Sequence, residues 1–117
     1  MPNITELDEK APEGGTFGIR CDFVEKMPDG DVPITPNPGL KWSLFDSRGT
    51  VINGKEDVPI SPAQSIYIVL TGDDLALAGG PTKRYVTVEG TYDGILGTGL
   101  PLISEVSFQI KNLVGKP

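Results

Sequence analysis

Apolar residues recur at every second position along several short stretches of this chain, which is the period of a β-strand. In Thr16–Glu25 one face of the strand carries Phe17, Ile19, Cys21 and Phe23, and the opposite face carries Gly18, Arg20, Asp22 and Val24. Comparable patterns predict six further strands, at Leu40–Asp46, Thr50–Ile52, Val58–Ile60, Ser65–Thr71, Arg84–Tyr92 and Glu105–Ile110. About seven strands and no sustained helical period predict an all-β sandwich or small barrel.

Glycine and proline residues punctuate these strands. Pro28-Asp29-Gly30 and Asn53-Gly54 are turn sequences, because proline presets φ and glycine accepts a positive φ. Val58–Ile60 is expected at a sheet edge, since Pro59 cannot donate to a ladder. The one helical candidate is Asp73–Leu77, which we expect to be a short 3₁₀ or α turn capped by Asp73.

The length of 117 residues predicts one domain. Residues 1–15 are polar and acidic, so we expect a flexible N-terminal arm that contributes at most one short edge strand. Residues 16–115 then form a single β-sandwich. The inward strand positions predict a core that includes Phe17, Ile19, Cys21, Trp42, Leu44, Val86, Val88 and Phe108. Trp42 is expected at its centre, as a packing residue rather than a binding residue.

The charge of the chain limits its partners. The net charge is −6, and the ten basic residues are dispersed, whereas nucleic-acid binding needs clustered Lys and Arg against phosphates. No apolar run approaches the length of a membrane span, and residues 1–10 lack the basic and apolar regions of a signal peptide. We therefore expect no nucleic-acid or membrane partner and a protein that is made in a cytoplasm and stays soluble.

Candidate catalytic groups are few. The chain has no histidine and one cysteine, which excludes Ser–His–Asp and Cys–His catalysis and zinc sites of the Cys/His type. A carboxylate pair remains available, and its candidates are Asp22, Glu25, Asp46, Glu89, Asp93 and Glu105. Most of these fall on outward positions or in turns, so we expect a solvated acidic surface. The prediction is a protein that is not an enzyme and that has no metal or cofactor.

The glycine-rich stretch Gly94–Ile103 is unusually apolar for a loop. Its spacing does not match a phosphate-binding loop, and it opens no helix. Its apolar residues are Ile95, Leu96, Leu100, Leu102 and Ile103. Either it folds over the open end of the sandwich and closes the core, or it exposes an apolar patch to a partner. In the second case Ile95, Leu96 and Leu100 are the docking residues, together with the N-terminal arm.

The Cys21 strand, the Trp42 strand and the tyrosine-bearing strand Arg84–Tyr92 together resemble an immunoglobulin-like domain. No second cysteine faces Cys21, and the spacing from Cys21 to Trp42 is longer than in true immunoglobulin domains. The resemblance therefore concerns the architecture, an immunoglobulin-like β-sandwich, rather than common ancestry.

A second resemblance, over most of residues 16–115, is to small proteins encoded among the structural genes of tailed bacteriophages and prophages. The similar stretches are Thr16–Phe23, Leu40–Leu44, Leu70–Leu77, Val88–Tyr92 and Phe108–Gly115. This resemblance implies a non-enzymatic virion or assembly protein of the head or head–tail region. The implied partners are capsid, neck or tail subunits or further copies of this chain, first in the host cytoplasm and then in the virion. It carries over no functional residues.

Two other functions stay open. A carbohydrate-binding or adhesion module would expose aromatic side chains, and the outward candidates are Phe45, Tyr67 and Tyr85. A small hydrolase would depend on a carboxylate pair that includes Glu89.

Overall fold

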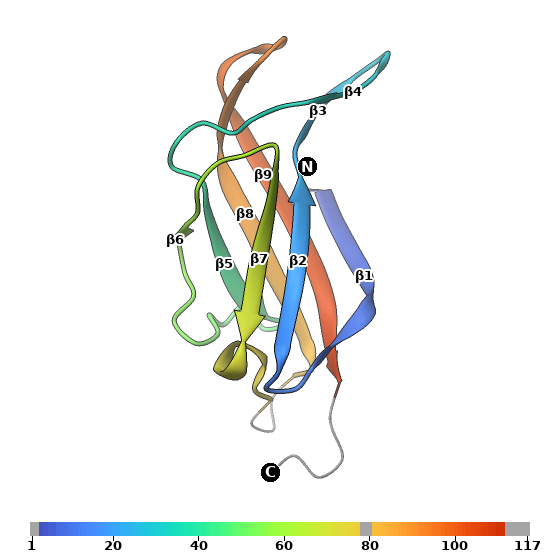
Figure 1. Ribbon diagram of the computed structural model, residues 1–117, viewed down its shortest axis with the longest axis vertical. Coiled ribbons are helices and arrows are strands. Elements are labelled where there is room, and N and C mark those ends of the chain that lie inside the picture. The colour runs from blue at the N-terminus through green and yellow to red at the C-terminus, as the bar shows by residue number, and fades with distance from the viewer. Residues whose placement is uncertain (1–2, 78–80, 112–117) are drawn as a thin grey trace.

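The computed structural model describes residues 3–77 and 81–111 and is nearly all β, as the alternation predicted (Figure 1). The strands are β1 (Asn3–Pro12), β2 (Thr16–Asp22), β3 (Val24–Met27), β4 (Gly30–Pro33), β5 (Lys41–Asp46), β6 (Val58–Pro59), β7 (Ser65–Thr71), β8 (Lys83–Gly94) and β9 (Gly97–Lys111). One 3₁₀ turn, η1 (Gly72–Leu75), follows β7. The described residues thus form nine strands, more than the seven expected.

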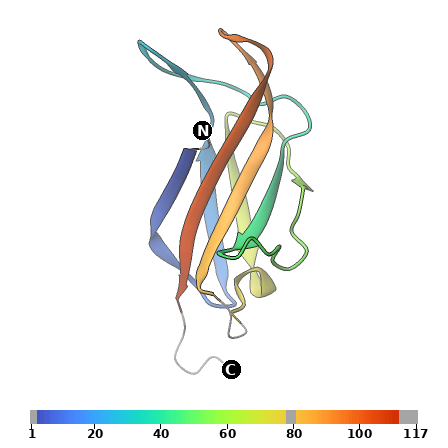
Figure 2. The same cartoon turned by 180° about the vertical axis from the view of Figure 1, so that it is seen from behind.

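The strands form a sandwich of unequal layers. The larger sheet has five strands in the order β1-β9-β8-β5-β6, and the smaller sheet is the antiparallel pair β2–β7, which lies across one face of the larger sheet (Figure 1). β8 and β9 are the longest strands, and Figure 2 shows them running the length of the other face. The hairpin β3–β4 and the turn between β8 and β9 both project from one end of the sandwich (Figure 1).

The core lies between the two sheets. Of the eight core residues named from the sequence, seven are buried, and Phe17 is half-buried and packs on the core with its ring 5.0 Å from that of Phe108. Trp42 and Leu44 of β5 face this layer beside Val86 and Val88 of β8, which pair with them across the ladder. The two-residue period therefore placed the inward residues on the correct face.

The N-terminal segment differs from the expected flexible arm. Residues 3–12 form β1, a ten-residue edge strand that pairs in parallel with β9. Among its described side chains, Ala11 is fully buried and Leu7 packs against the core. The polar composition concealed this strand because an edge strand is held mainly by its backbone ladder, which leaves no period in the sequence.

Three other boundaries differ from the prediction. The strand expected over Thr16–Glu25 breaks at Phe23, after which the chain leaves the sandwich as the hairpin β3–β4. The hairpin expected at Thr50–Ile52 is reduced to a single bridge between Phe45 and Val51. The expected loop after Tyr92 is mostly strand, because β8 and β9 continue to a turn at residues 95–96, with a register shift between Tyr92 and Gly94.

The turn η1 is capped differently from the expectation. Its N-cap is Thr71, whose backbone N–H donates to the carboxylate of Asp74 at 3.1 Å. Asp74 is buried and also accepts a hydrogen bond from the side-chain amide of Asn53 at 2.9 Å. Asp73, the cap named from the sequence, is exposed. The acidic pair therefore has a structural role, and Asp74 is the residue of the pair that makes the capping hydrogen bond.

Candidate functional site

The turn between β8 and β9, which we call the apolar tip, consists of Ile95 and Leu96. The two residues are 70% and 62% exposed, and among the exposed large hydrophobic residues of the described chain only Tyr67, at 64%, is comparable. Of the two alternatives for this segment, the exposed apolar patch describes its tip, which projects away from the sandwich (Figure 1), while Leu102 packs against the core. Leu100, the third predicted docking residue, is half-buried and pairs with Tyr92 below the tip.

The apolar tip is fastened to the neighbouring hairpin by Glu25. This residue of β3 is 1% exposed, and its carboxylate accepts hydrogen bonds from the backbone N–H groups of Ile95 at 3.0 Å and Leu96 at 3.2 Å. The hydroxyl of Tyr92 donates a third hydrogen bond at 3.1 Å. Three donors compensate the buried charge, as a buried carboxylate requires. The carboxylate therefore fixes both tip residues through their backbone and leaves their side chains free.

Glycine at position 94 makes room for this arrangement. A Cβ added at Gly94 would lie 2.5 Å from an Oε atom of Glu25 and 2.8 Å from the ring of Tyr92. Burial, followed by the hydrogen bond to Glu25, raises the pKa of Tyr92, so the hydroxyl keeps its proton and acts as a donor. Glu25, Tyr92 and Gly94 thus form one unit that holds the apolar tip.

Glu25 was expected on a solvated surface, and this was wrong. The signal that places it inside was available, since residue 25 is in phase with Phe17, Ile19 and Phe23 on the inward face. Asp46 also differs from the expected solvated acidic surface. It is 3% exposed and accepts the backbone N–H groups of Arg48 and Thr50, at 2.8 and 3.1 Å, so it closes the turn after β5.

The other candidates for chemistry also have structural partners. Burial raises the pKa of Asp46, but the hydrogen bonds from Thr50 and Arg48 outweigh it, and the net pKa is lowered. Asp22 accepts from Ser65 and Arg20, which lowers its pKa. Burial of Cys21 raises the pKa of its thiol from 9.0 to about 11, so the thiol is protonated near neutral pH. Within residues 3–77 and 81–111, no three His, Cys, Asp or Glu side chains are placed to hold a metal ion.

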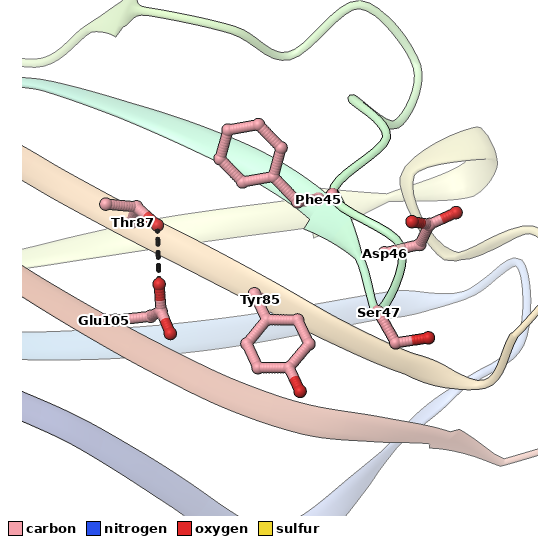
Figure 3. Close-up of a pocket in the computed structure, with 7 residues that line it drawn as sticks. Phe45, Asp46, Ser47, Tyr85, Thr87 and Glu105 are labelled. Atoms are coloured by element: carbon pink, nitrogen blue, oxygen red, sulfur yellow. Dashed lines mark hydrogen bonds between the residues drawn. The ribbon is translucent and has the colours of Figure 1, made fainter.

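A second feature is an open depression of about 340 Å³ on the outer face of the larger sheet. Figure 3 shows the rings of Phe45 and Tyr85 in this depression beside Thr87, whose hydroxyl is hydrogen-bonded to Glu105 at 3.2 Å. Tyr67 belongs to β7 in the other sheet, so the three outward aromatic residues named from the sequence do not form one platform. Only Phe45 and Tyr85 come together.

No protein-family model, no curated protein and no solved structure matches this chain. In the part of the chain that the structure describes, no helix has the length and apolar character needed to cross a membrane.

Proposed function

We propose that this protein is a non-enzymatic structural or assembly component of a tailed-phage virion, in the head or head–tail region, and that it docks on other virion subunits through the apolar tip. The resemblance of residues 16–115 to small phage structural proteins supplies the setting. The single observation that carries the mode of action is the apolar tip itself, two exposed hydrophobic side chains on a backbone that a buried carboxylate fixes.

A fixed apolar tip suits docking on energetic grounds. Burying a large aliphatic side chain contributes about 1.5–3 kcal/mol, so Ile95 and Leu96 together supply roughly 3–6 kcal/mol against a partner pocket. A mobile loop would spend part of this gain on ordering its backbone. The hydrogen bonds that the tip amides donate to Glu25 place that ordering cost in the folding of the subunit, before any partner is met.

The candidate reactive groups support a role without catalysis. Glu25 and Asp46 are engaged by backbone N–H donors, and Cys21 is buried with a raised pKa. No histidine is available to activate these groups, since the chain contains none. A protein whose carboxylates and thiol are engaged in this way is better suited to binding through its surface than to catalysing a reaction.

The test is incorporation into particles. The double variant Ile95→Ser, Leu96→Ser removes the apolar tip and keeps the backbone that Glu25 binds. Val69→Ser is a matched control, because Val69 is a 57% exposed aliphatic residue on β7, in the other sheet. The proposal expects virions of the encoding phage or induced prophage to contain the wild-type chain and the Val69 variant and to lack the double variant. Equal incorporation of all three would overturn it.

A second candidate function, carbohydrate binding, rests on the depression lined by Phe45 and Tyr85 (Figure 3). Adjacent aromatic rings with polar neighbours can stack on a sugar ring and bond its hydroxyls. A glycan array would show saturable binding that Tyr85→Ala abolishes and Tyr67→Ala, in the opposite sheet, leaves intact. Binding of no glycan, or equal loss in both variants, would reject this candidate.

A further inference from the structure

A groove of about 520 Å³ lies between the hairpin β3–β4 and the apolar tip, at the end of the sandwich from which both project (Figure 1). Val32 lines it from β4 and Ile95 from the tip, and the polar residues Thr35, Gln64 and Asp93 also line it. Ile95 belongs to both features, so a partner that covers the apolar tip also reaches the groove. The groove thus combines apolar walls with polar groups.

The charge around this groove has one sign. Its charged lining residues are Glu25 and Asp93, and no Lys or Arg is among the residues that line it. The adjacent hairpin β3–β4 contains one cation, Lys26, which is already paired with Asp31 at 3.0 Å. Asp29 and Asp93 are exposed, and neither forms an ion pair within the described part of the chain. Charge complementarity at this end therefore favours a cationic partner.

Asp93 is held in place with one carboxylate oxygen open. Its Oδ1 accepts the backbone N–H of Gly99 at 2.7 Å and the side-chain amide of Asn37 at 3.3 Å. Asn37 is itself positioned, because the same amide donates to the hydroxyl of Thr91 at 3.3 Å. Among the described residues, no group donates to Oδ2 of Asp93. The protein therefore orients this carboxylate before any partner arrives and leaves an acceptor for a cation.

The acceptors of the groove come from separate segments of the chain. Thr35 follows β4, Gln64 precedes β7 and Asp93 lies in β8, and all three residues are exposed. A guanidinium carries several N–H donors in a planar fork, whereas an ammonium gathers its donors on one atom. Acceptors that are spread around a groove therefore suit the head group of arginine better than that of lysine.

We infer that this groove receives an arginine side chain of the protein on which the apolar tip docks. An arginine lays its aliphatic stem along apolar surface while its charged head reaches polar groups. Val32 and Ile95 cover the stem, and the guanidinium donates to the open oxygen of Asp93. The inference rests on the proposed docking role and adds the chemistry of the partner, which is an apolar pocket with an arginine at its rim.

The arginine contributes mainly to specificity. An ion pair that stays open to solvent changes affinity by about fivefold at most, whereas the apolar tip provides the larger share of the binding. Complementary charge instead selects the partner and fixes its orientation. The contact with Asp93 should also weaken as salt is added, because exposed charges are screened.

The first experiment titrates two synthetic peptides into the full chain and follows its backbone amides by NMR. One peptide is acetyl-Gly-Leu-Arg-Leu-Gly-amide, and the other carries citrulline, which keeps the shape of arginine without its charge. The arginine peptide should give saturable shifts at Gly94 and Ile95 and none at Val69, which lies on β7. The citrulline peptide should bind about fivefold more weakly.

Two variants locate the charge that the arginine meets. Asp93→Asn keeps an acceptor for the N–H of Gly99 and turns an NH₂ group toward the arginine, so it should bind both peptides equally. Asp29→Asn is the matched control, because Asp29 carries the same charge on the neighbouring hairpin but does not line the groove. That control should keep the preference for arginine.

A second experiment separates this inference from the proposed function. Asp93→Lys places a cation where the arginine binds and should lower incorporation into virions, whereas Asp29→Lys should be incorporated like the wild type. If Asp93→Lys is incorporated normally while Ile95→Ser, Leu96→Ser is lost, the docking role stands and the arginine contact is rejected. The absence of saturable shifts at Gly94 and Ile95, equal affinity of the wild type for both peptides, or loss of the preference in both Asn variants would likewise overturn the inference.

Discussion

Replacing Glu25 with glutamine should release the apolar tip from the rest of the sandwich. The glutamine keeps the shape of the side chain but retains only one acceptor oxygen, and it turns an NH₂ group toward donors that need acceptors. The carboxylate of Glu25 accepts three hydrogen bonds with two oxygens, and the glutamine offers one of these positions only. Tyr92 and Leu96 bind one carboxylate oxygen and Ile95 binds the other, so an amide oxygen in the first position keeps two hydrogen bonds, now to a neutral acceptor, and loses the one from Ile95.

The magnitude follows from the charge of the acceptor. A hydrogen bond to a charged group contributes about 1.5–3 kcal/mol, so the lost bond costs about that much, and the two that remain weaken because a neutral acceptor replaces a charged one. A neutral side chain is easier to bury than a carboxylate, and the tip amides of the variant can bond to water. We therefore expect the local opening free energy of the tip to fall by about 2 kcal/mol, which corresponds to about thirtyfold faster exchange.

Native-state hydrogen exchange measures this directly at the amides of Ile95 and Leu96. The matched control is Glu105→Gln, since Glu105 is half-buried in β9 and bonded to the hydroxyl of Thr87. That control should leave tip exchange unchanged. If Glu25→Gln also leaves the exchange of both tip amides unchanged, the anchoring role assigned to Glu25 is refuted.

Three further predictions concern the tip, the core and the buried thiol. Gly94→Ala should speed tip exchange as Glu25→Gln does, because its methyl group would displace the carboxylate; unchanged exchange would contradict this steric account. Trp42→Ala should lower the free energy of unfolding by about 3–5 kcal/mol in urea denaturation, and a loss under 1 kcal/mol would remove Trp42 from the core. As the pH rises from 9 through about 11, the unfolded chain loses the Cys21 proton before the folded chain does. Stability should therefore fall over that range, and denaturation of Cys21→Ala should show a smaller fall.

The sequence predicted the interior of the fold because the two-residue period reports which face of a strand is buried. That period placed Trp42, Val86 and Val88 correctly, whereas Glu25, although in phase with the inward residues, was expected on the surface because of its charge. A buried carboxylate depends on donors that come from distant segments. Two of the three donors of Glu25 are backbone N–H groups about seventy residues away in the chain, where no side-chain pattern records them.

The edges of the fold were harder to predict for a related reason. β1 is held by its ladder to β9, and few of its side chains report that contact. The glycines near the apolar tip indicated a loop, yet they serve a long hairpin, with Gly99 at a φ of +61° and Gly94 leaving space for Glu25. The pairing of backbones and the close approach of Glu25 to Gly94 are three-dimensional properties. Composition alone therefore predicted a flexible arm in place of β1 and a loop in place of the long hairpin.

The most direct test of the assembly role compares purified virions of the encoding phage or induced prophage by quantitative mass spectrometry. The account predicts a fixed number of copies of the wild-type chain per particle and loss of the chain when Ile95 and Leu96 are both replaced by serine. Particles that never contain the wild-type chain, or that retain the double variant at the same copy number, would contradict it.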